Sequence, residues 1–215
     1  MDPKPIGILG GSFDPVHKGH LSLAESVCRY FDLLEVRLIP VCQPVHRAAL
    51  HASSEQRLQM LQLAVSDQIA MRIDDREIVR AGPSYTIDTL KSLKNEFGQH
   101  ILCLIMGMDA FVSLDTWHQW DSIFQYAHIV YSRRPGSELK ISNDKLRKLY
   151  NDRFCENPRD LYQSTAGSIF EVPAPQLDIS STQVREWLKK KQIPAEVLPE
   201  KVLTFIRKEG IYNRH

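Results

Sequence analysis

Near its start the chain reads Gly10-Gly11-Ser12-Phe13-Asp14-Pro15-Val16-His17-Lys18-Gly19-His20, directly after an apolar stretch over residues 6–10. That stretch has the length and composition of a buried β-strand. Residues 19–30 then carry apolar side chains at helical spacing, which predicts an amphipathic helix. The quoted residues therefore form the turn from a first strand into a first helix. In open α/β sheets, ligands bind at such turns, beyond the carboxyl ends of the strands.

The same alternation of strand-length and helix-length segments continues along the chain, and it is typical of parallel βαβ units. Further strands are predicted at residues 36–40, 71–73, 101–106, 127–131 and 169–172. Helices are predicted at residues 54–66, with Ser54 as the N-cap, and at 86–97, 144–150, 180–190 and 199–208. We therefore expect a single α/β domain over residues 1–215, with a mostly parallel sheet and two C-terminal helices.

Length and composition restrict the class of protein. The 215 residues are 43% hydrophobic, which is enough for one sizeable core. The 27 Lys and Arg nearly balance the 26 Asp and Glu, which argues against a general binder of nucleic acid or membranes. The first apolar run is far too short for a signal-peptide core or a membrane span, so we expect a soluble, cytoplasmic protein. The four cysteines lie far apart, without zinc spacing or a disulfide framework.

Gly10 and Gly11 give the turn the character of a phosphate cradle. Glycines let the backbone approach a phosphate closely and reach angles barred to other residues, and the helix N-terminus behind them offers free N–H groups. The turn has neither the G-x-x-x-x-G-K-[ST] pattern nor the G-x-G-x-x-G pattern. These absences argue against a P-loop hydrolase and against dinucleotide-dependent hydride transfer.

His17 and His20 lie three residues apart at the start of the predicted helix, so both imidazoles can face one ligand as hydrogen-bond donors. Taken alone, the pair also fits two exposed surface histidines. Metal ligation is a third interpretation, weakened because no carboxylate or cysteine stands at matching spacing. We assign no metal-binding residue.

With Gly19 between them, the two histidines resemble the H-x-G-H element of a nucleotidyltransferase superfamily that has a Rossmann-like, doubly wound fold. Ile179-Ser180-Ser181-Thr182-Gln183-Val184-Arg185 resembles the I-S-S-T-x-[IV]-R element of adenylyltransferases that make NAD. Alone, this second element would be merely a well-capped helix, although its hydroxyls, N–H groups and arginine suit phosphate. The resemblance implies catalytic roles for His17, His20 and Arg185. It also implies ATP binding by these three together with Gly10, Gly11, Ser12, Phe13, Asp109, Ile179, Ser181 and Thr182.

Four further segments resemble the bacterial nicotinate-nucleotide adenylyltransferases: Pro83-Ser84-Tyr85-Thr86, Gly107-Met108-Asp109, Thr116-Trp117 and Arg133-Arg134-Pro135-Gly136. The resemblance implies that the pyridine ring of nicotinate mononucleotide stacks on Trp117, and that its carboxylate meets the N–H groups of Thr86 and His118. Because Thr86 begins a predicted helix, the helix dipole favours this acid over the neutral amide by about 1 kcal/mol or more. The same resemblance places Ser12, His46, Tyr85 and Arg134 on the mononucleotide.

Several of these assignments have alternatives in the sequence itself. Asp109 is implied to accept hydrogen bonds from ribose hydroxyls, but it also fits a helix cap. Trp117 also fits the core, and Arg133 is the alternative to Arg134 for the mononucleotide phosphate. His46 and Arg47 resemble the P-x-H-[KR] element of the family. The departures from the family pattern are Met108, where smaller or polar residues often occur, and Ser12, where threonine is frequent.

The resemblance implies transfer of the adenylyl group of ATP to nicotinate mononucleotide, which forms nicotinate adenine dinucleotide (deamido-NAD) and pyrophosphate in NAD biosynthesis. The expected mechanism is in-line attack without a covalent intermediate, with Mg²⁺ bound through the phosphates of ATP. One rival is a related adenylyl- or cytidylyltransferase, such as one acting on phosphopantetheine. Another is a non-catalytic sensor of ATP or NAD. The oligomeric state stays open, and a homo-oligomer is compatible with the sequence.

Overall fold

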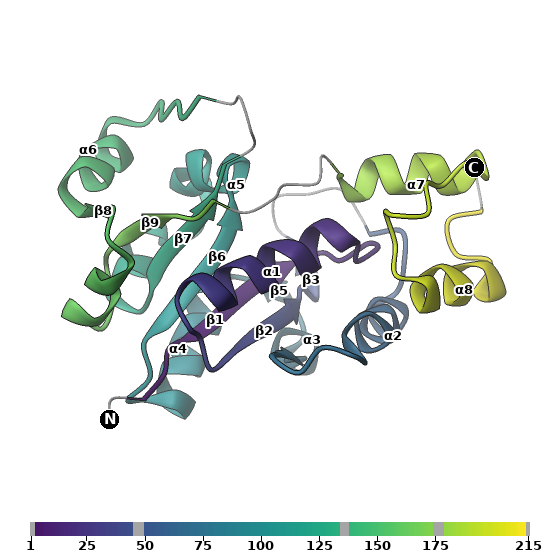
Figure 1. The fold of residues 1–215 in the computed structure, drawn as a ribbon, viewed down its shortest axis with the longest axis horizontal. Coiled ribbons are helices and arrows are strands. Elements are labelled where there is room, and N and C mark those ends of the chain that lie inside the picture. The colour runs from purple at the N-terminus through teal and green to yellow at the C-terminus, as the bar shows by residue number, and fades with distance from the viewer. Residues whose placement is uncertain (1–2, 45–49, 134–137, 174–178, 214–215) are drawn as a thin grey trace.

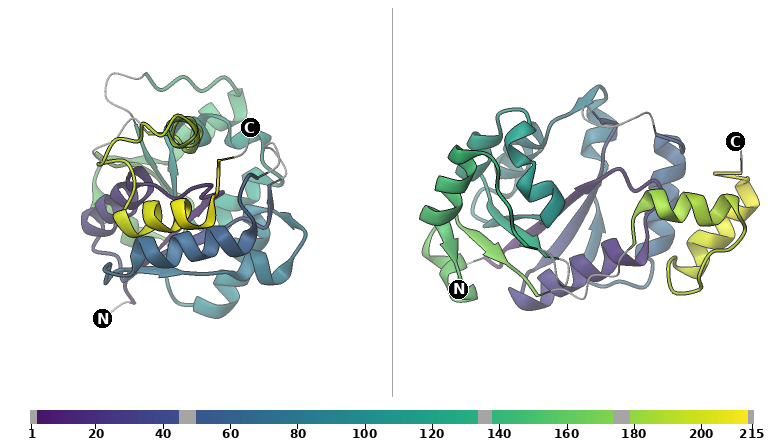
Figure 2. Two further views of the ribbon diagram at one scale, coloured as in Figure 1. Left: turned by 90° about the vertical axis from the view of Figure 1, so that its right-hand side faces the viewer. Right: turned by 90° about the horizontal axis from the view of Figure 1, so that it is seen from above.

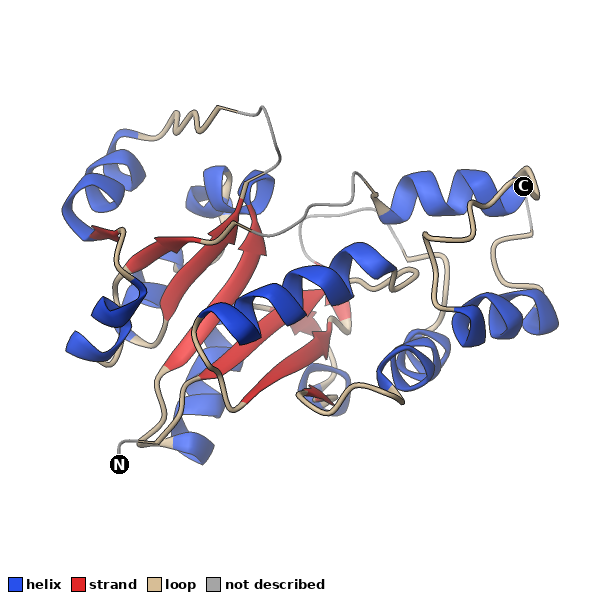
Figure 3. Cartoon of the chain, in the orientation of Figure 1, coloured by secondary structure: helices blue, strands red, loops and turns tan. Residues whose placement is uncertain are grey.

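The structure is a computed structural model that describes residues 3–44, 50–133, 138–173 and 179–213. At its centre lies a parallel sheet whose described strands follow the order β4-β2-β1-β6-β7-β9-β8 (Figures 1 and 3). All pairings between these strands are parallel, which confirms the predicted doubly wound, Rossmann-like α/β fold. The strands are β1 (Ile6–Gly11), β2 (Glu35–Pro40), β4 (Met71–Ile73), β6 (Leu102–Gly107), β7 (His128–Ser132), β8 (Phe154–Cys155) and β9 (Ile169–Glu171).

Both faces of the sheet are covered by helices, because the central strands are apolar on both sides. In β6, Leu104 joins one hydrophobic cluster while its neighbour Ile105 joins the other. Figure 1 shows α1 in front of the sheet and α4 behind it. The cluster on the α1 side takes residues from α1 (Lys18–Tyr30), α2 (Ser54–Val65), α7 (Ser181–Lys189) and α8 (Glu200–Glu209). The other cluster takes residues from α4 (Thr86–Phe97), α5 (Met108–Val112) and α6 (Asp144–Arg153).

The winding of the chain places the switch point of the sheet between β1 and β6. From β1 the chain moves outward through β2 to β4, then returns to β6 on the other side of β1 and continues to β7 and β9. The carboxyl ends of β1 and β6 are therefore followed by connections that leave in opposite directions, which is where open α/β sheets bind ligands. The pairing of Ile8 with Leu104 brings Gly11 and Gly107 to the same edge of the sheet.

The C-terminal helices lie beside α2, far from the edge strand β8 (Figure 1). α8 packs along α2, and the left view of Figure 2 shows the two helices side by side. Lys201 Nζ donates to Ser66 Oγ (2.7 Å), which ties the start of α8 to the end of α2. The α8 helix stops at Gly210, whose φ of 64° is the left-handed conformation common at helix ends. In the described ranges, none of the helices has the length and apolar character needed to cross a bilayer.

The prediction that Ser54 is the N-cap of α2 was wrong by one residue. Ser53 is the N-cap, since its hydroxyl accepts from Gln56 N (3.2 Å) while Ser53 N donates to Gln56 Oε1 (3.0 Å). This reciprocal pair is a capping box, which needs Gln or Glu three residues after the cap. Only Ser53 has a glutamine at that distance, whereas Ser54 is already the first helical residue.

The short elements were missed because two to five residues carry no measurable periodicity. They include α3 (Arg76–Arg80) and the strands β3 (Gln43–Pro44) and β5 (Pro83–Ser84), which pair in parallel as a separate ribbon. The described residues that follow residue 137 include the helix predicted at residues 144–150. They contain α6, β8 and a 3₁₀ helix at Pro158–Gln163, and β8 closes the sheet edge against β9.

Gly7 tests the packing of the sheet under α1. A Cβ at Gly7 would lie 2.9 Å from Ile105 Cδ1 and Val36 Cγ2. We expect Gly7→Val to lower the free energy of unfolding by about 1–3 kcal/mol, because the inserted side chain overpacks a filled core. Urea denaturation measures this change. The matched control is Gly10→Ala in the same strand, where the added Cβ meets nothing within 4 Å. Equal stability of the two variants would contradict the packing described here.

Candidate active site

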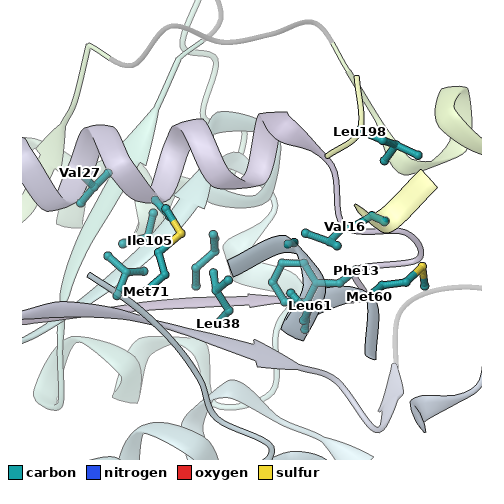
Figure 4. Packing of buried hydrophobic residues seen from close by; sticks show 14 of the residues in the cluster. Phe13, Val16, Val27, Leu38, Met60, Leu61, Met71, Ile105 and Leu198 are labelled. Carbon is teal, nitrogen blue, oxygen red and sulfur yellow. The ribbon is translucent and has the colours of Figure 1, made fainter. Parts of the chain in front are cut away.

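The turn between β1 and α1 is anchored by two of its own apolar side chains. Phe13 and Val16 are fully buried and join the cluster that contains Met60 and Leu198 (Figure 4). Phe13 also has a φ of 48°, the left-handed conformation that side chains rarely adopt. The expectation that the adjacent glycines take such angles was therefore wrong. The strain falls instead on Phe13, whose burial holds it in place.

Gly10 instead provides open space. Gly10 and Gly11 both lie in β1 without positive φ, and Gly10 is exposed. A Cβ on Gly10 would meet nothing within 4 Å, whereas a Cβ on Gly11 would lie 3.2 Å from Phe13 Cζ. Close approach of a ligand to the backbone, rather than unusual angles, is what the glycine at position 10 permits.

Asp14 holds the turn to two distant parts of the chain. Its carboxylate is 2% exposed, and Oδ1 accepts from the Tyr212 hydroxyl (2.7 Å) and from Ala52 N (3.1 Å). Oδ2 accepts from His51 N (2.8 Å). A buried carboxylate needs such donors, because transfer from water without them costs several kcal/mol. Asp14 therefore joins the turn, the entry to α2 and the C-terminal end. No local pattern points to this role, because Tyr212 lies 198 residues away in the chain.

Arg57 supplies the positive charge opposite Asp14. It is fully buried, with Nη1 donating to Ser12 O (3.0 Å) and Nη2 to Ser54 Oγ (3.0 Å). Burial lowers the pKa of Arg57, and the nearby charge of Asp14 acts in the opposite direction. Arg57, which the sequence analysis also missed, supports the backbone of the turn from below.

The N-terminal half of α7 docks directly on the same turn. Arg185 Nη1 donates to Asp14 O (2.7 Å), and Ser181 Oγ donates to Pro15 O (3.1 Å). Arg185 Nη2 also donates to Thr182 Oγ1 (3.2 Å), which fixes the guanidinium against its own helix. The helix that carries I-S-S-T-Q-V-R therefore contacts the residues that directly precede H-x-G-H in the chain.

Ser180 begins α7 as its N-cap. Its hydroxyl accepts from Gln183 N (3.2 Å), and Ser180 N donates to Gln183 Oε1 (2.8 Å). Ile179, just before the cap, is half-buried and packs against the core on the α1 side. The start of the helix is thus set by a capping box and an apolar contact, and the side chains of Ser181 and Arg185 contact the turn.

His17 and His20 lie against each other at the start of α1. Their ring centroids are 3.8 Å apart, and His17 N donates to His20 Nδ1 (3.3 Å). Because His20 Nδ1 accepts this bond, the neutral ring carries its proton on Nε2. His17 is 5% exposed, and burial lowers its pKa to about 4. His17 is therefore neutral near pH 7, not a second positive charge.

A second group of predicted residues gathers around the start of α4. Tyr85 is the N-cap of α4, and Thr86 is its first residue, so the Thr86 N–H has no acceptor within the helix. The rings of Tyr85 and His118 lie 4.5 Å apart, which brings the loop after α5 to this helix end. Trp117 is half-buried: it packs against the α4-side cluster, and part of the residue stays exposed to solvent.

Asp109 lies exposed in the first turn of α5, immediately after the carboxyl end of β6. The alternative that it caps this helix was wrong, since the N-cap is Gly107. His46 and Arg134 fall outside the described residues. Arg133 is described, and its Nη2 forms an ion pair with Glu171 Oε1 (2.9 Å) on β9. Over the four described ranges, no group of three or more His, Cys, Asp or Glu side chains is arranged to hold a metal ion.

Comparisons with known proteins identify relatives over nearly the whole chain. A model of the cytidylyltransferase-like family matches residues 8–187. A probable nicotinate-nucleotide adenylyltransferase of Methylococcus capsulatus is 40% identical over 208 residues, covering 96% of this chain and 99% of the relative. A protein of the same description from Escherichia coli O139:H28 is 38% identical over 206 residues, covering 95% and 97%.

Solved structures share the fold at low sequence identity. The nicotinic acid mononucleotide adenylyltransferase of Plasmodium falciparum, complexed with NaAD, superposes with a TM-score of 0.74 at 18% identity, covering 99% of this chain and 98% of the other. A putative nicotinate-nucleotide adenylyltransferase from Vibrio parahaemolyticus gives a TM-score of 0.66 at 15% identity, covering 99% and 97%.

The burial of His17 makes the stability of the protein depend on pH. The folded imidazole has a pKa of about 4, against 6.5 for the free side chain, so the unfolded chain takes up the proton first as the pH falls. The contribution of neutral His17 is thus present above pH 6.5 and is lost as the pH falls toward 4. We expect urea denaturation to show a steeper loss of stability between pH 7 and pH 5 in the native protein than in His17→Gln. Parallel losses would contradict a buried, neutral His17.

Proposed function

The chain belongs to the cytidylyltransferase-like family and, within it, to the nicotinate-nucleotide adenylyltransferases, and we propose that it transfers the adenylyl group of ATP to nicotinate mononucleotide, releasing pyrophosphate. The observation that carries this proposal is the docking of α7 on the turn, with Arg185 Nη1 2.7 Å from Asp14 O. It supports a triphosphate site shared by Arg185 and the imidazole pair. Because the hydrogen bond from Tyr212 also reaches this turn, the chain from end to end acts as one nucleotidyltransferase unit.

The triphosphate of ATP lies over the turn in this proposal. It is surrounded by two parts of the chain: the backbone of residues 10–12, and the start of α7 with Ser181 and Thr182. His20 donates a hydrogen bond to it from Nε2. His17 donates as a neutral ring, so Arg185 provides the full positive charge of this group. The side chain of Phe13 is buried, and any contact it makes with ATP is through its backbone. Ile179 contributes in the same way, and Asp109 accepts from the ribose hydroxyls.

Nicotinate mononucleotide takes the neighbouring half of the proposed site. Its carboxylate accepts hydrogen bonds from the N–H groups of Thr86 and His118. The ring contact between Tyr85 and His118 brings these two segments together. The exposed side of Trp117 stacks on the pyridine ring. Ser12 lies between the two substrates, on the turn. His46 and Arg134 complete the phosphate end of this proposal, although both lie outside the described residues.

The reaction needs positioning more than proton transfer. A phosphate oxygen of the mononucleotide attacks the α-phosphorus of ATP in line, a new P–O bond forms, and the bond to the β-phosphate breaks with release of pyrophosphate. The attacking phosphate is already ionised near pH 7, so no general base is needed. His17, His20 and Arg185 stabilise the charge that develops on the transferred group. ATP enters as its Mg²⁺ complex, and this chain's part is to hold the phosphates.

A pyrophosphate-release assay with purified protein and MgATP tests the reaction. We expect release with nicotinate mononucleotide, much weaker release with its amide, and none with phosphopantetheine, because only the acid presents a carboxylate to the start of α4. Release with phosphopantetheine instead would identify a different transferase of the same superfamily. Tight binding of ATP without release from any of the three would identify a nucleotide sensor.

His17→Ala tests the imidazole pair. We expect kcat to fall roughly 100-fold or more, the scale of one lost transition-state donor. Steady-state kinetics with both substrates saturating measures this. His100→Ala is the matched control. His100 hydrogen-bonds Lys4 O (2.8 Å), and both residues lie just before the amino ends of β6 and β1, away from the proposed site at the carboxyl ends. Normal turnover in His17→Ala would remove this ring from the chemistry.

A further inference from the structure

Glu77 is a buried carboxyl that the proposed mechanism does not use. It lies in α3, is 5% exposed, and accepts a hydrogen bond at Oε1 from Thr89 Oγ1 (2.6 Å). Its other oxygen, Oε2, is buried and has no partner in the part of the chain that the structure describes. A buried carboxyl with one oxygen unsatisfied is costly, so its position calls for a reason.

The partner of Glu77 belongs to the first turns of α4. Thr89 N donates to Tyr85 O (3.3 Å), so Thr89 is bonded through its backbone to the N-cap and through its hydroxyl to Glu77. Thr86, whose N–H faces out of the helix end, lies between these two attachment points in the chain. Arg80 Nη2 also reaches Thr89 Oγ1 (3.4 Å), which adds a donor on the same hydroxyl.

Ser84 is a second neighbour of Glu77 at the start of α4, because it directly precedes the N-cap Tyr85. Its hydroxyl accepts from Cys42 N (2.9 Å), which links β5 to the segment entering β3. That hydroxyl also lies near enough to Glu77 to influence its pKa. Glu77 therefore neighbours both the residue before Tyr85 and the residue one turn after it.

The groups around the Glu77 carboxyl act on its pKa in opposite directions. Burial raises the pKa, while the hydroxyls of Thr89 and Ser84 and the guanidinium of Arg80 lower it. The carboxyl also supplies the acceptor for the Thr89 hydroxyl.

We propose that Glu77 is a positioning residue for acid recognition: it holds the first turn of α4 in the orientation in which the Thr86 N–H receives the carboxylate of the pyridine ring. This inference rests on the proposed function. It assigns the preference for acid over amide partly to a side chain that does not touch the substrate. A purely structural Glu77 would affect every substrate and the stability of the fold alike.

Two pairs of variants separate these roles, measured as kcat/KM for the acid mononucleotide and its amide and as KM for ATP. We expect Glu77→Ala and Thr89→Val to lower kcat/KM for the acid roughly 10-fold, since a small misplacement of a recognition group costs that much or more. KM for ATP and kcat/KM for the amide should change less than about twofold, so the acid-over-amide ratio falls. Glu77→Gln and Thr89→Ser keep the acceptor and the donor respectively, and both should restore most of the ratio.

Glu96→Gln is the matched control. Glu96 lies near the other end of α4, where Oε2 pairs with Arg76 Nη2 (2.7 Å), so the variant removes one carboxylate charge from the same helix and the same contact with α3. It should leave the acid-over-amide ratio unchanged even if thermal unfolding shifts. A fall in the ratio equal to that of Glu77→Ala would overturn the positioning role.

The outcomes also separate this inference from the proposed function. If the native protein does not prefer the acid, the proposed carboxylate site fails, and the inference fails with it. If the native protein prefers the acid but Glu77→Ala and Thr89→Val keep the native ratio, only the inference is overturned. Should Glu77→Ala fail to fold, the pair Thr89→Val and Thr89→Ser decides alone, because neither removes the buried carboxyl.

Discussion

The hydrogen bonds of the Asp14 carboxylate are the constraint on which the rest of the site depends. This one buried group accepts from the Tyr212 hydroxyl and from the backbone of His51 and Ala52, while Arg185 binds its backbone oxygen. Three parts of the chain thereby converge on one turn. Loss of any donor would leave a buried negative charge less well satisfied, so the three parts hold one another in place. The turn is thus rigid before any phosphate arrives, which is what preorganised catalysis requires.

Positive charge in the site is local, which fits the nearly neutral net charge of +1 for the whole chain. The positive charge of Arg57 lies near the carboxylate of Asp14, so it compensates a charge within the protein rather than one on a ligand. His17 is neutral because of its burial, and Arg185 is held by Asp14 and Thr182. In the proposed site, the described residues offer a triphosphate helix N-termini, hydrogen-bond donors and the guanidinium of Arg185. This balance allows charge neutralisation in the transition state without a surface that attracts anions in general.

In the proposed function, the switch point of the sheet divides the two substrates between two structural units. The proposed ATP side comprises β1, α1 and α7, whereas the proposed nicotinate side comprises β5, α4 and the loop that follows α5. The two sides meet at the carboxyl ends of β1 and β6, so their relative placement is as firm as the central pair of strands. The buried contact of Glu77 with Thr89 extends this principle, because it braces the N-terminus of α4 from a neighbouring helix.

Local patterns were enough to predict the parallel α/β fold and the long strands and helices to within a few residues. The elements H-x-G-H and I-S-S-T-Q-V-R were found as short motifs. Hydrophobic periodicity and helix capping depend on residues that are neighbours in the chain, so the sequence alone reveals them. The short strands β3 and β5, the capping role of Ser53 in place of Ser54, and the strained φ of Phe13 were not found this way. The partnership of Asp14 with Tyr212 and the burial of Glu77 and His17 arise from contacts between segments far apart in the chain. Only folding creates those contacts, because burial and hydrogen-bond partners depend on what packs from elsewhere.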